Sequence, residues 1–239
     1  MARELRRRPA GGGRGGAPTL SSVPPAVDAV VLFDLDGVLA DSRAAITGCL
    51  NDALAAHGLP RRDPADLYRH IGPPLPLAFA EIVGAPPDSH LVAACIASYR
   101  ERYAVASLTD TEVTPGIAGA LAGLADAGRR LGVATSKPKP FAEPLLDALG
   151  LLRFFAVVAG PELDVPSESK TKTVGNALRA LGASGGTMVG DRSFDMVAAR
   201  AHGLRAVGVA WGIGSREELE AAGADVIVAT PGELAGAVG

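Results

Sequence analysis

The sequence predicts an α/β fold in which helices cover both faces of a parallel β-sheet and a small helical domain is inserted after the first strand. Short valine-rich runs, bounded by glycine or polar residues, recur along the chain, as is typical of strands buried on both faces. Helical patterns separate these runs, and this alternation favours right-handed crossovers between parallel strands. A helical stretch of about seventy residues after Ser42 breaks the alternation and is far longer than an ordinary connection.

Six apolar runs are expected to form the sheet. In chain order they read AVVLFD (29–34), RRLGVATS (129–136), FFAVVAG (154–160), GTMVGD (186–191), LRAVGVAW (204–211) and ADVIVAT (224–230). The helical patterns between them cover residues 117–127, 141–149, 171–181, 194–202 and 216–222. We therefore expect the core domain to comprise residues 27–42 and 115–239.

The inserted stretch, residues 43–114, is helical in pattern throughout. Apolar residues recur at three- and four-residue spacing, for example in SRAAITGCLNDALAAHG (42–58) and DSHLVAACIASYRERY (88–103). This spacing indicates amphipathic helices that pack on one another. We expect these residues to form a helical cap beside the end of the first strand.

Composition limits the class of protein. The chain has 239 residues, 48% of them hydrophobic, which suits one sizeable domain carrying a smaller one. The longest apolar runs are strand-sized, so we expect no membrane span. The net charge is −3 and no basic face is evident, which argues against a nucleic-acid partner. Cys49 and Cys95 lie in apolar helical patterns and are expected to be small buried residues without a disulfide.

The N-terminal residues 1–26 differ from the rest of the chain. They are rich in arginine, glycine, proline and serine, which predicts a disordered tail. They lack the apolar segment of a signal peptide. We therefore expect a cytoplasmic protein, present as a monomer or a homodimer.

Polar residues end three of the predicted strands. Asp34, Thr135 and Asp191 each follow an apolar run, and the carboxyl ends of parallel strands meet at one edge, where ligands bind. Any strand end needs a polar residue, but this explains poorly why one strand ends in Asp-x-Asp and another in Gly-Asp. We expect a functional site at this edge.

The clustered carboxylates predict a hard cation. Asp34, Asp36 and Asp191 offer oxygen ligands with no histidine nearby, which is the pattern that Mg²⁺ prefers. A divalent ion also makes the clustering tolerable, since it neutralises carboxylates that would otherwise repel one another. Mg²⁺ in turn favours a phosphate substrate.

The same residues suggest a reaction. Asp34 could attack phosphorus and form an acyl phosphate. Gly37 allows a turn after Asp36 that could bring its carboxyl group over the site as an acid and base. The Thr135 hydroxyl could donate to a phosphoryl oxygen, helped by backbone amides at the start of a helix. A balancing lysine follows the third strand, at position 170 or 172.

Four segments together resemble the motifs of haloacid-dehalogenase-superfamily hydrolases of the phosphoglycolate-phosphatase-like group, which have a Rossmann-like core and a helical cap. The segments are DLDGVLADS (34–42), VATSKP (133–138), ESKTKTVGNAL (168–178) and MVGDRSFDM (188–196). The resemblance implies that Asp34 is the nucleophile and that Asp36 is the acid and base. It also implies that Asp36 offers its backbone carbonyl to Mg²⁺.

The resemblance assigns the remaining motif residues. Thr135, with Ser136 beside it, would bind the phosphoryl group, and Lys170 fits the motif lysine better than Lys172 does. Asp191 would bind the metal, with Asp195 supporting it directly or through water. Two points stay open: Asp195 could instead be a carboxylate favoured at a helix start, and Arg192 occupies a place often held by a small hydroxyl residue.

The cap offers weaker substrate-binding candidates. His70 precedes IGPPLP (71–76), and the turn at Gly72 and Pro73 resembles the cap loop that faces the active site in related phosphatases, although it could be a simple helix breaker. Three cap arginines are weaker candidates for an anion, since most helical arginines face solvent: Arg69, Arg100 and Arg102. The other histidines are expected at the surface or in the cap: His57, His90 and His202.

The expected function is Mg²⁺-dependent hydrolysis of a small-molecule phosphate monoester through an aspartyl-phosphate. Phosphoglycolate, a sugar phosphate or a nucleoside monophosphate would fit. The alternatives are a phosphomutase with the same nucleophile and a catalytically silent binding protein, which the complete motif set disfavours. Dehalogenase chemistry would leave Asp36 without a role, and Schiff-base chemistry would need a cap lysine, which residues 43–114 lack.

Overall fold

The core of the protein is a six-stranded parallel sheet. The computed structural model describes residue 1, residues 30–163 and residues 168–239, so the predicted tail, apart from Met1, lies outside the described residues. The strands, in spatial order, are β5 (Phe155–Ala159), β4 (Arg130–Ala134), β1 (Val30–Phe33), β6 (Thr187–Gly190), β7 (Arg205–Val209) and β8 (Val226–Val228). Neighbouring strands all pair in parallel. The predicted α/β class and the six predicted strands are confirmed.

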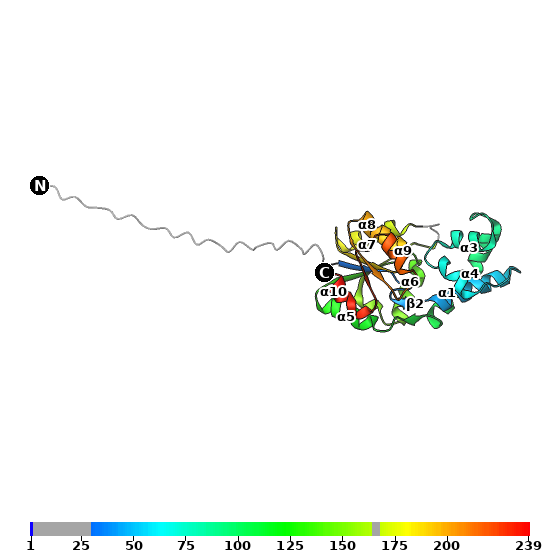
Figure 1. Cartoon of the computed structure of the whole chain (residues 1–239), viewed down its shortest axis with the longest axis horizontal. Helices are drawn as coiled ribbons and strands as arrows, with labels where there is room; N and C mark the ends of the chain where they lie inside the picture. The colour runs from blue at the N-terminus through cyan, green and yellow to red at the C-terminus, as the bar shows by residue number, and fades with distance from the viewer. Residues whose placement is uncertain (2–29, 164–167) are drawn as a thin grey trace.

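Helices cover both faces of this sheet because its strands alternate their apolar side chains. Val31 and Phe33 belong to one apolar cluster, whereas Val30 and Leu32 belong to the other. The first face is covered by α5 (Ile117–Asp126), α6 (Lys139–Ala148) and α10 (Leu234–Ala237). The second is covered by α7 (Lys170–Leu181), α8 (Ser193–Ala201) and α9 (Arg216–Ala221). Figure 1 shows the sheet between α5 and α10 on one side and α7, α8 and α9 on the other. Two short 3₁₀ helices complete the core, η2 (Leu152–Phe154) and η3 (Pro231–Glu233).

The inserted residues form a separate helical layer at one end of the molecule (Figure 1). Its elements are α1 (Arg43–Ala56), α2 (Pro64–Leu67), η1 (Tyr68–His70), α3 (Leu75–Val83) and α4 (His90–Thr109). They share an apolar cluster of their own, which includes Phe79 and Cys95. Cys49 and Cys95 are both buried and unbonded, as predicted. We call residues 43–114 the cap.

A short β-ribbon joins the cap to the core. β2 (Ala40–Asp41) pairs antiparallel with β3 (Glu112–Val113), so the two crossings of the chain between core and cap lie side by side. The sequence does not predict this ribbon, because two-residue strands carry too short a pattern. Within the described ranges, no helix is both long and apolar enough to cross a membrane.

A substitution at Gly186, directly before β6, can test how closely the chain packs against the neighbouring strand β1. Its φ is +140°, and a Cβ there would lie 2.3 Å from the carbonyl oxygen of Val30. Gly186→Ala is expected to lower the free energy of unfolding by at least about 3 kcal/mol, because strain and a backbone clash add. Gly182 has a φ of +60° but open space around it, so Gly182→Ala is expected to cost only about 1–2 kcal/mol. Urea unfolding measures both, and equal losses would contradict the clash.

Candidate active site

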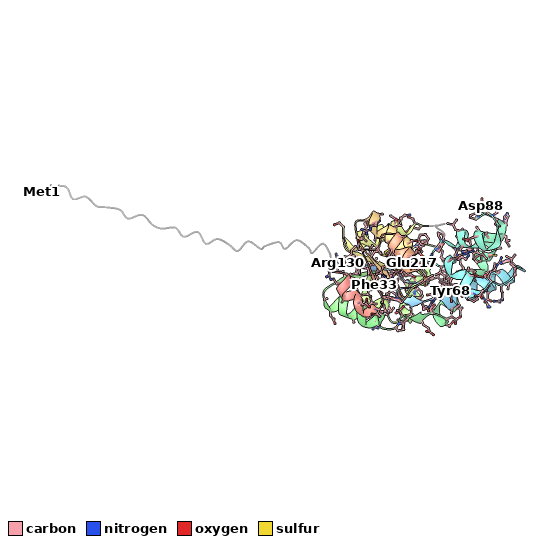
Figure 2. All side chains as sticks on the ribbon, viewed as in Figure 1. Met1, Phe33, Tyr68, Asp88, Arg130 and Glu217 are labelled. Atoms are coloured by element: carbon pink, nitrogen blue, oxygen red, sulfur yellow. The ribbon has the colours of Figure 1, made fainter. Side chains whose placement is uncertain are left out.

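Asp34 lies at the centre of the carboxyl edge of the sheet. It directly follows Phe33, the last residue of the central strand β1, which Figure 2 labels within the sheet. Its Oδ1 accepts a hydrogen bond from the backbone N–H of Leu35 (2.7 Å) and lies 2.8 Å from Nζ of Lys170. Burial raises the pKa of Asp34 to about 6, against the opposing effect of Lys170 and with a further contribution from Asp195.

Lys170 neutralises part of this negative charge. It is the first residue of α7, and Ser169 caps the helix by accepting from the N–H of Lys172. Nζ of Lys170 lies 2.8 Å from both Asp34 Oδ1 and Asp195 Oδ1, and the side chain is buried. Burial opposes its charge, but the carboxylates of Asp195 and Asp34 outweigh burial and raise the pKa of Lys170 above its usual range. The side chain of Lys172 points to Glu168 and is largely exposed, so the structure brings Lys170 into the site.

Asp191 follows β6, and the structure leaves one of its oxygens without a partner. Its Oδ2 accepts from the backbone N–H of Ile213 at 2.7 Å, while Oδ1 is buried and has no hydrogen-bond partner among the described residues. Burial, together with the charges of Asp195 and Asp34, raises the pKa of Asp191 well above its usual range. A buried carboxylate in this state needs either a proton or a cation.

Asp195 contacts both Lys170 in the carboxylate cluster and the backbone at the start of α8. Its Oδ2 accepts from the N–H of Arg192 at 3.1 Å, as a carboxylate near a helix start commonly does, while its Oδ1 meets Lys170. Ligand oxygens of Asp34, Asp191 and Asp195 lie within 4.8 Å of one another. Three carboxylates against one ammonium leave two uncompensated negative charges, so the residues present fit a divalent cation with oxygen ligands.

Asp36 points away from this cluster. Its carboxylate pairs with Lys137 (Oδ1 to Nζ, 2.7 Å) and lines the cavity under the cap. Gly37 makes the turn with a φ of +86°, and the N–H groups of Leu39 and Ala40 both bond to the carbonyl of Leu35. A Cβ on Gly37 would lie 2.2 Å from Asp191 Oδ2, so the Asp36–Gly37 peptide runs beside the carboxylate cluster. The carboxylates of Asp34 and Asp36 therefore lie on different sides of one turn.

Thr135 and Ser136 follow β4, which pairs directly with β1. The register sets Phe33 opposite Val133, so the ends of the two strands reach the same edge. Thr135 is buried, and its Oγ1 accepts from the N–H of Lys137 at 3.1 Å, which leaves its hydroxyl hydrogen available to a ligand. Ser136 lines the cavity.

A cavity of about 430 Å³ lies between this edge and the cap. The cap candidates His70, Gly72 and Pro73 line it together with Asp36 and Ser136, so the structure brings these sequence candidates together. Its other walls are mostly apolar, among them Ile46, Pro74, Leu75, Ile96, Phe141 and Leu163. Burial lowers the pKa of His70.

Other sequence candidates lie elsewhere. Among the arginines, Arg100 lines the cavity and donates to the carbonyl of Leu163 at 3.0 Å. Arg69 pairs with Glu81, and Arg102 pairs with Asp52 on the cap surface. None of the remaining histidines lines the cavity; in order, His57 contacts Ser98, His90 begins α4 at the surface, and His202 contacts the carbonyl of Thr171 in the core.

Two charged residues matter more than the sequence indicated. Arg192 pairs with Glu218 (Nε to Oε1, 3.1 Å) and donates to the carbonyl of Ile71, so it links the core to the cap loop. Lys137 is buried and pairs with Asp36. The sequence did carry a usable signal for Lys137, since this lysine comes directly after Thr135 and Ser136 at the end of a strand. The role of Arg192 depends on a contact with the cap, which no local pattern encodes.

Comparisons with known proteins agree with this geometry. Residues 31–209 match the family described as haloacid dehalogenase-like hydrolase. A 5'-nucleotidase of Pseudomonas aeruginosa is 37% identical, over 80% of this chain and 86% of its own. Tyrosine-protein kinase PtkA of Mycobacterium tuberculosis is 36% identical, over 92% of this chain and 75% of its own. The crystal structure of a predicted phosphatase from Clostridium acetobutylicum superposes with a TM-score of 0.82 at 34% identity, over 87% of this chain and 97% of that one. The chain therefore belongs to the haloacid dehalogenase-like hydrolase family, and it is a phosphatase of that family.

Proposed function

We propose that this phosphatase hydrolyses small-molecule phosphate monoesters with Mg²⁺, through an aspartyl-phosphate on Asp34. The observation that carries the proposal is the division of the carboxylates. Asp34 shares a buried cluster with Lys170, Asp191 and Asp195, whereas Asp36 lines the cavity that would hold the rest of the substrate. One carboxylate is placed to attack phosphorus and another to handle the proton of the leaving group.

The first half-reaction transfers the phosphoryl group to the protein. An oxygen of Asp34 forms a bond to phosphorus while the ester P–O bond breaks, and the electron pair goes to the leaving oxygen. Asp36 gives its proton to that oxygen, so an alcohol departs into the cavity. Lys170 and the Thr135 hydroxyl stabilise the charge on the phosphoryl oxygens.

The second half-reaction restores the protein. Water attacks phosphorus, its proton goes to Asp36, the bond to Asp34 breaks, and inorganic phosphate is released. When bound, Mg²⁺ would supply positive charge to the phosphoryl oxygens and the cluster. Its ligands would be the carboxylates of Asp34, Asp191 and Asp195, with the backbone carbonyl of Asp36. The unpartnered Oδ1 of Asp191 supports this assignment.

The cavity supports a small substrate. A volume of about 430 Å³ suits a metabolite, and the lining residues come from both the core and the cap. Phosphoglycolate, sugar phosphates and nucleoside monophosphates are the candidates, and the name of the 5'-nucleotidase relative supports including the last of these. Since another relative is named a tyrosine kinase, ATP with a tyrosine peptide belongs in the same screen.

Replacing the nucleophile should abolish turnover. Asp34→Asn keeps the size of the side chain but removes the attacking charge, so kcat should fall at least about a thousandfold, or about 4 kcal/mol in the barrier. The exposed Asp147 is the matched control, and Asp147→Asn should keep wild-type kcat. Phosphate release from p-nitrophenyl phosphate measures both. A folded Asp34 variant that keeps more than about a tenth of wild-type kcat, a change of about 1.4 kcal/mol, would rule out this nucleophile.

Metal binding can be measured apart from turnover. Mg²⁺ should raise the Tm of the wild type, because a ligand at about 100 times its Kd adds about 2.7 kcal/mol of stability. Asp191→Asn should lose most of that rise, whereas Asp147→Asn should keep it. EDTA should abolish activity, and Ca²⁺ should restore it poorly because its coordination is larger and looser. Full activity after prolonged incubation in excess EDTA would exclude a metal-dependent reaction.

The cap should restrict the size of the substrate. Small phosphate monoesters are expected to show kcat/KM at least about tenfold higher, or about 1.4 kcal/mol, than a phosphoprotein or a 5′-phosphorylated oligonucleotide. His70→Ala should reorder the small substrates and leave the Mg²⁺ dependence unchanged. A metabolite panel run beside the macromolecules in one buffer measures this. A preference for the macromolecules would mean that the cap is a docking surface.

A further inference from the structure

Lys137 makes an unusual set of contacts for a buried lysine. It lies in the turn between β4 and α6, and only 3% of its side chain is exposed. Its Nζ lies 2.7 Å from Asp36 Oδ1 and also donates to the hydroxyl of Tyr103, which belongs to cap helix α4. One ammonium therefore joins the carboxylate after β1 to a side chain of the cap.

The surroundings of Tyr103 hold this contact in place. Its ring stacks on Tyr99 with centroids 5.2 Å apart and meets Phe141 of the core edge-on at 5.7 Å. Nζ of Lys137 lies 4.9 Å from the centroid of the Tyr103 ring, within the range of a cation–π contact. Burying an ammonium is costly unless its partners are well arranged, so a lysine placed here needs a reason beyond packing.

We propose that Lys137 is a positioning residue for Asp36, and that Tyr103 makes this positioning depend on the cap. This proposal rests on the proposed function. Lys137 holds Oδ1 of Asp36, while Oδ2 makes no hydrogen bond to any described residue and is available to carry the transferred proton. Because Tyr103 belongs to the cap, movement of the cap away from the core breaks its bond to Lys137. The acid and base is then fully oriented only when the cap lies over the substrate.

The competing role for Lys137 is direct binding of substrate, and the two roles predict different kinetics. Protonation by Asp36 matters for an alkoxide leaving group and little for p-nitrophenolate, which departs without a proton. Loss of a positioning residue should therefore harm alkyl esters selectively. Loss of a substrate-binding group should harm esters of similar size equally.

The test compares kcat/KM for p-nitrophenyl phosphate and 2-phenylethyl phosphate. Lys137→Met should lower the value for the alkyl ester at least about 100-fold and that for the aryl ester less than about tenfold. Asp36→Asn should show the same selectivity, and the double variant should be no worse than Asp36→Asn alone, because the two residues act as one unit. The partly exposed Lys139, which pairs with Glu143, is the control, and Lys139→Met should change neither value.

The cap contact is tested separately. Tyr103→Phe removes one oxygen and keeps the ring, so it should lower the alkyl-ester value at least about tenfold, as expected for one lost bond to a charged group. Tyr68, labelled on the cap in Figure 2, is the control, and Tyr68→Phe should leave it unchanged. Tyr103→Phe also carries the test if circular dichroism shows that Lys137→Met does not fold.

The outcomes separate this proposal from the proposed function. If the wild type hydrolyses neither ester with Mg²⁺, the proposed function fails and this proposal fails with it. If the wild type is active but Lys137→Met harms both esters equally, only the positioning role of Lys137 is wrong. If Lys137→Met is selective and Tyr103→Phe has no effect, the dependence on the cap is wrong.

Discussion

Three carboxylates share one buried cluster with a single lysine, and much of the local structure exists to hold them there. Asp34, Asp191 and Asp195 would repel one another without Lys170 and, as proposed, a divalent cation. The parallel sheet makes the cluster possible because β1 and β6 are neighbours whose carboxyl ends meet at one edge. The start of α7 supplies the lysine to the same edge. Under the proposed function, the electrostatic cost of the cluster would be relieved when a cation binds there.

The backbone around the cluster is shaped by the same constraint. The Asp36–Gly37 turn approaches Asp191 so closely that only a residue without a Cβ fits at position 37. This turn also separates the two aspartates, so that Asp34 stays in the cluster while Asp36 faces the cavity. In a straight strand, residues two positions apart point to the same face, so Asp34 and Asp36 would point the same way. The turn therefore separates the proposed nucleophile, Asp34, from the proposed acid and base, Asp36.

The cap contacts the core at points close to the chemistry. Tyr103 meets Lys137 and Phe141, and Arg192 donates to the carbonyl of Ile71. The β2–β3 ribbon sets both chain crossings side by side, which is the arrangement of a hinge. Under the two proposals, the position of α4 would affect both the orientation of Asp36, through Tyr103, and the shape of the cavity, which Ile96 lines.

The sequence by itself determined the fold class, the six strands and the main members of the candidate site. Buried parallel strands are continuous apolar runs, and each strand end that carries chemistry is marked by a polar residue directly after such a run, as at Asp34, Thr135 and Asp191. The turn at Gly37 is also encoded locally, but the Lys137 partner of Asp36 is not. These features depend on neighbours in the chain, so a single sequence is enough to find them.

Only the tertiary structure decided the contacts between residues that are far apart in the sequence. It brought Lys170 rather than Lys172 into the site, because the start of α7 sets which side chain faces inward. It gave Lys137 a partner 101 positions away and one from the cap, and it gave Arg192 a partner in the cap loop. It also placed His70 at the cavity while His57 and Arg102 stayed outside. Such contacts arise from packing between separately formed layers, and no periodicity or motif in the chain specifies which side chains will meet there.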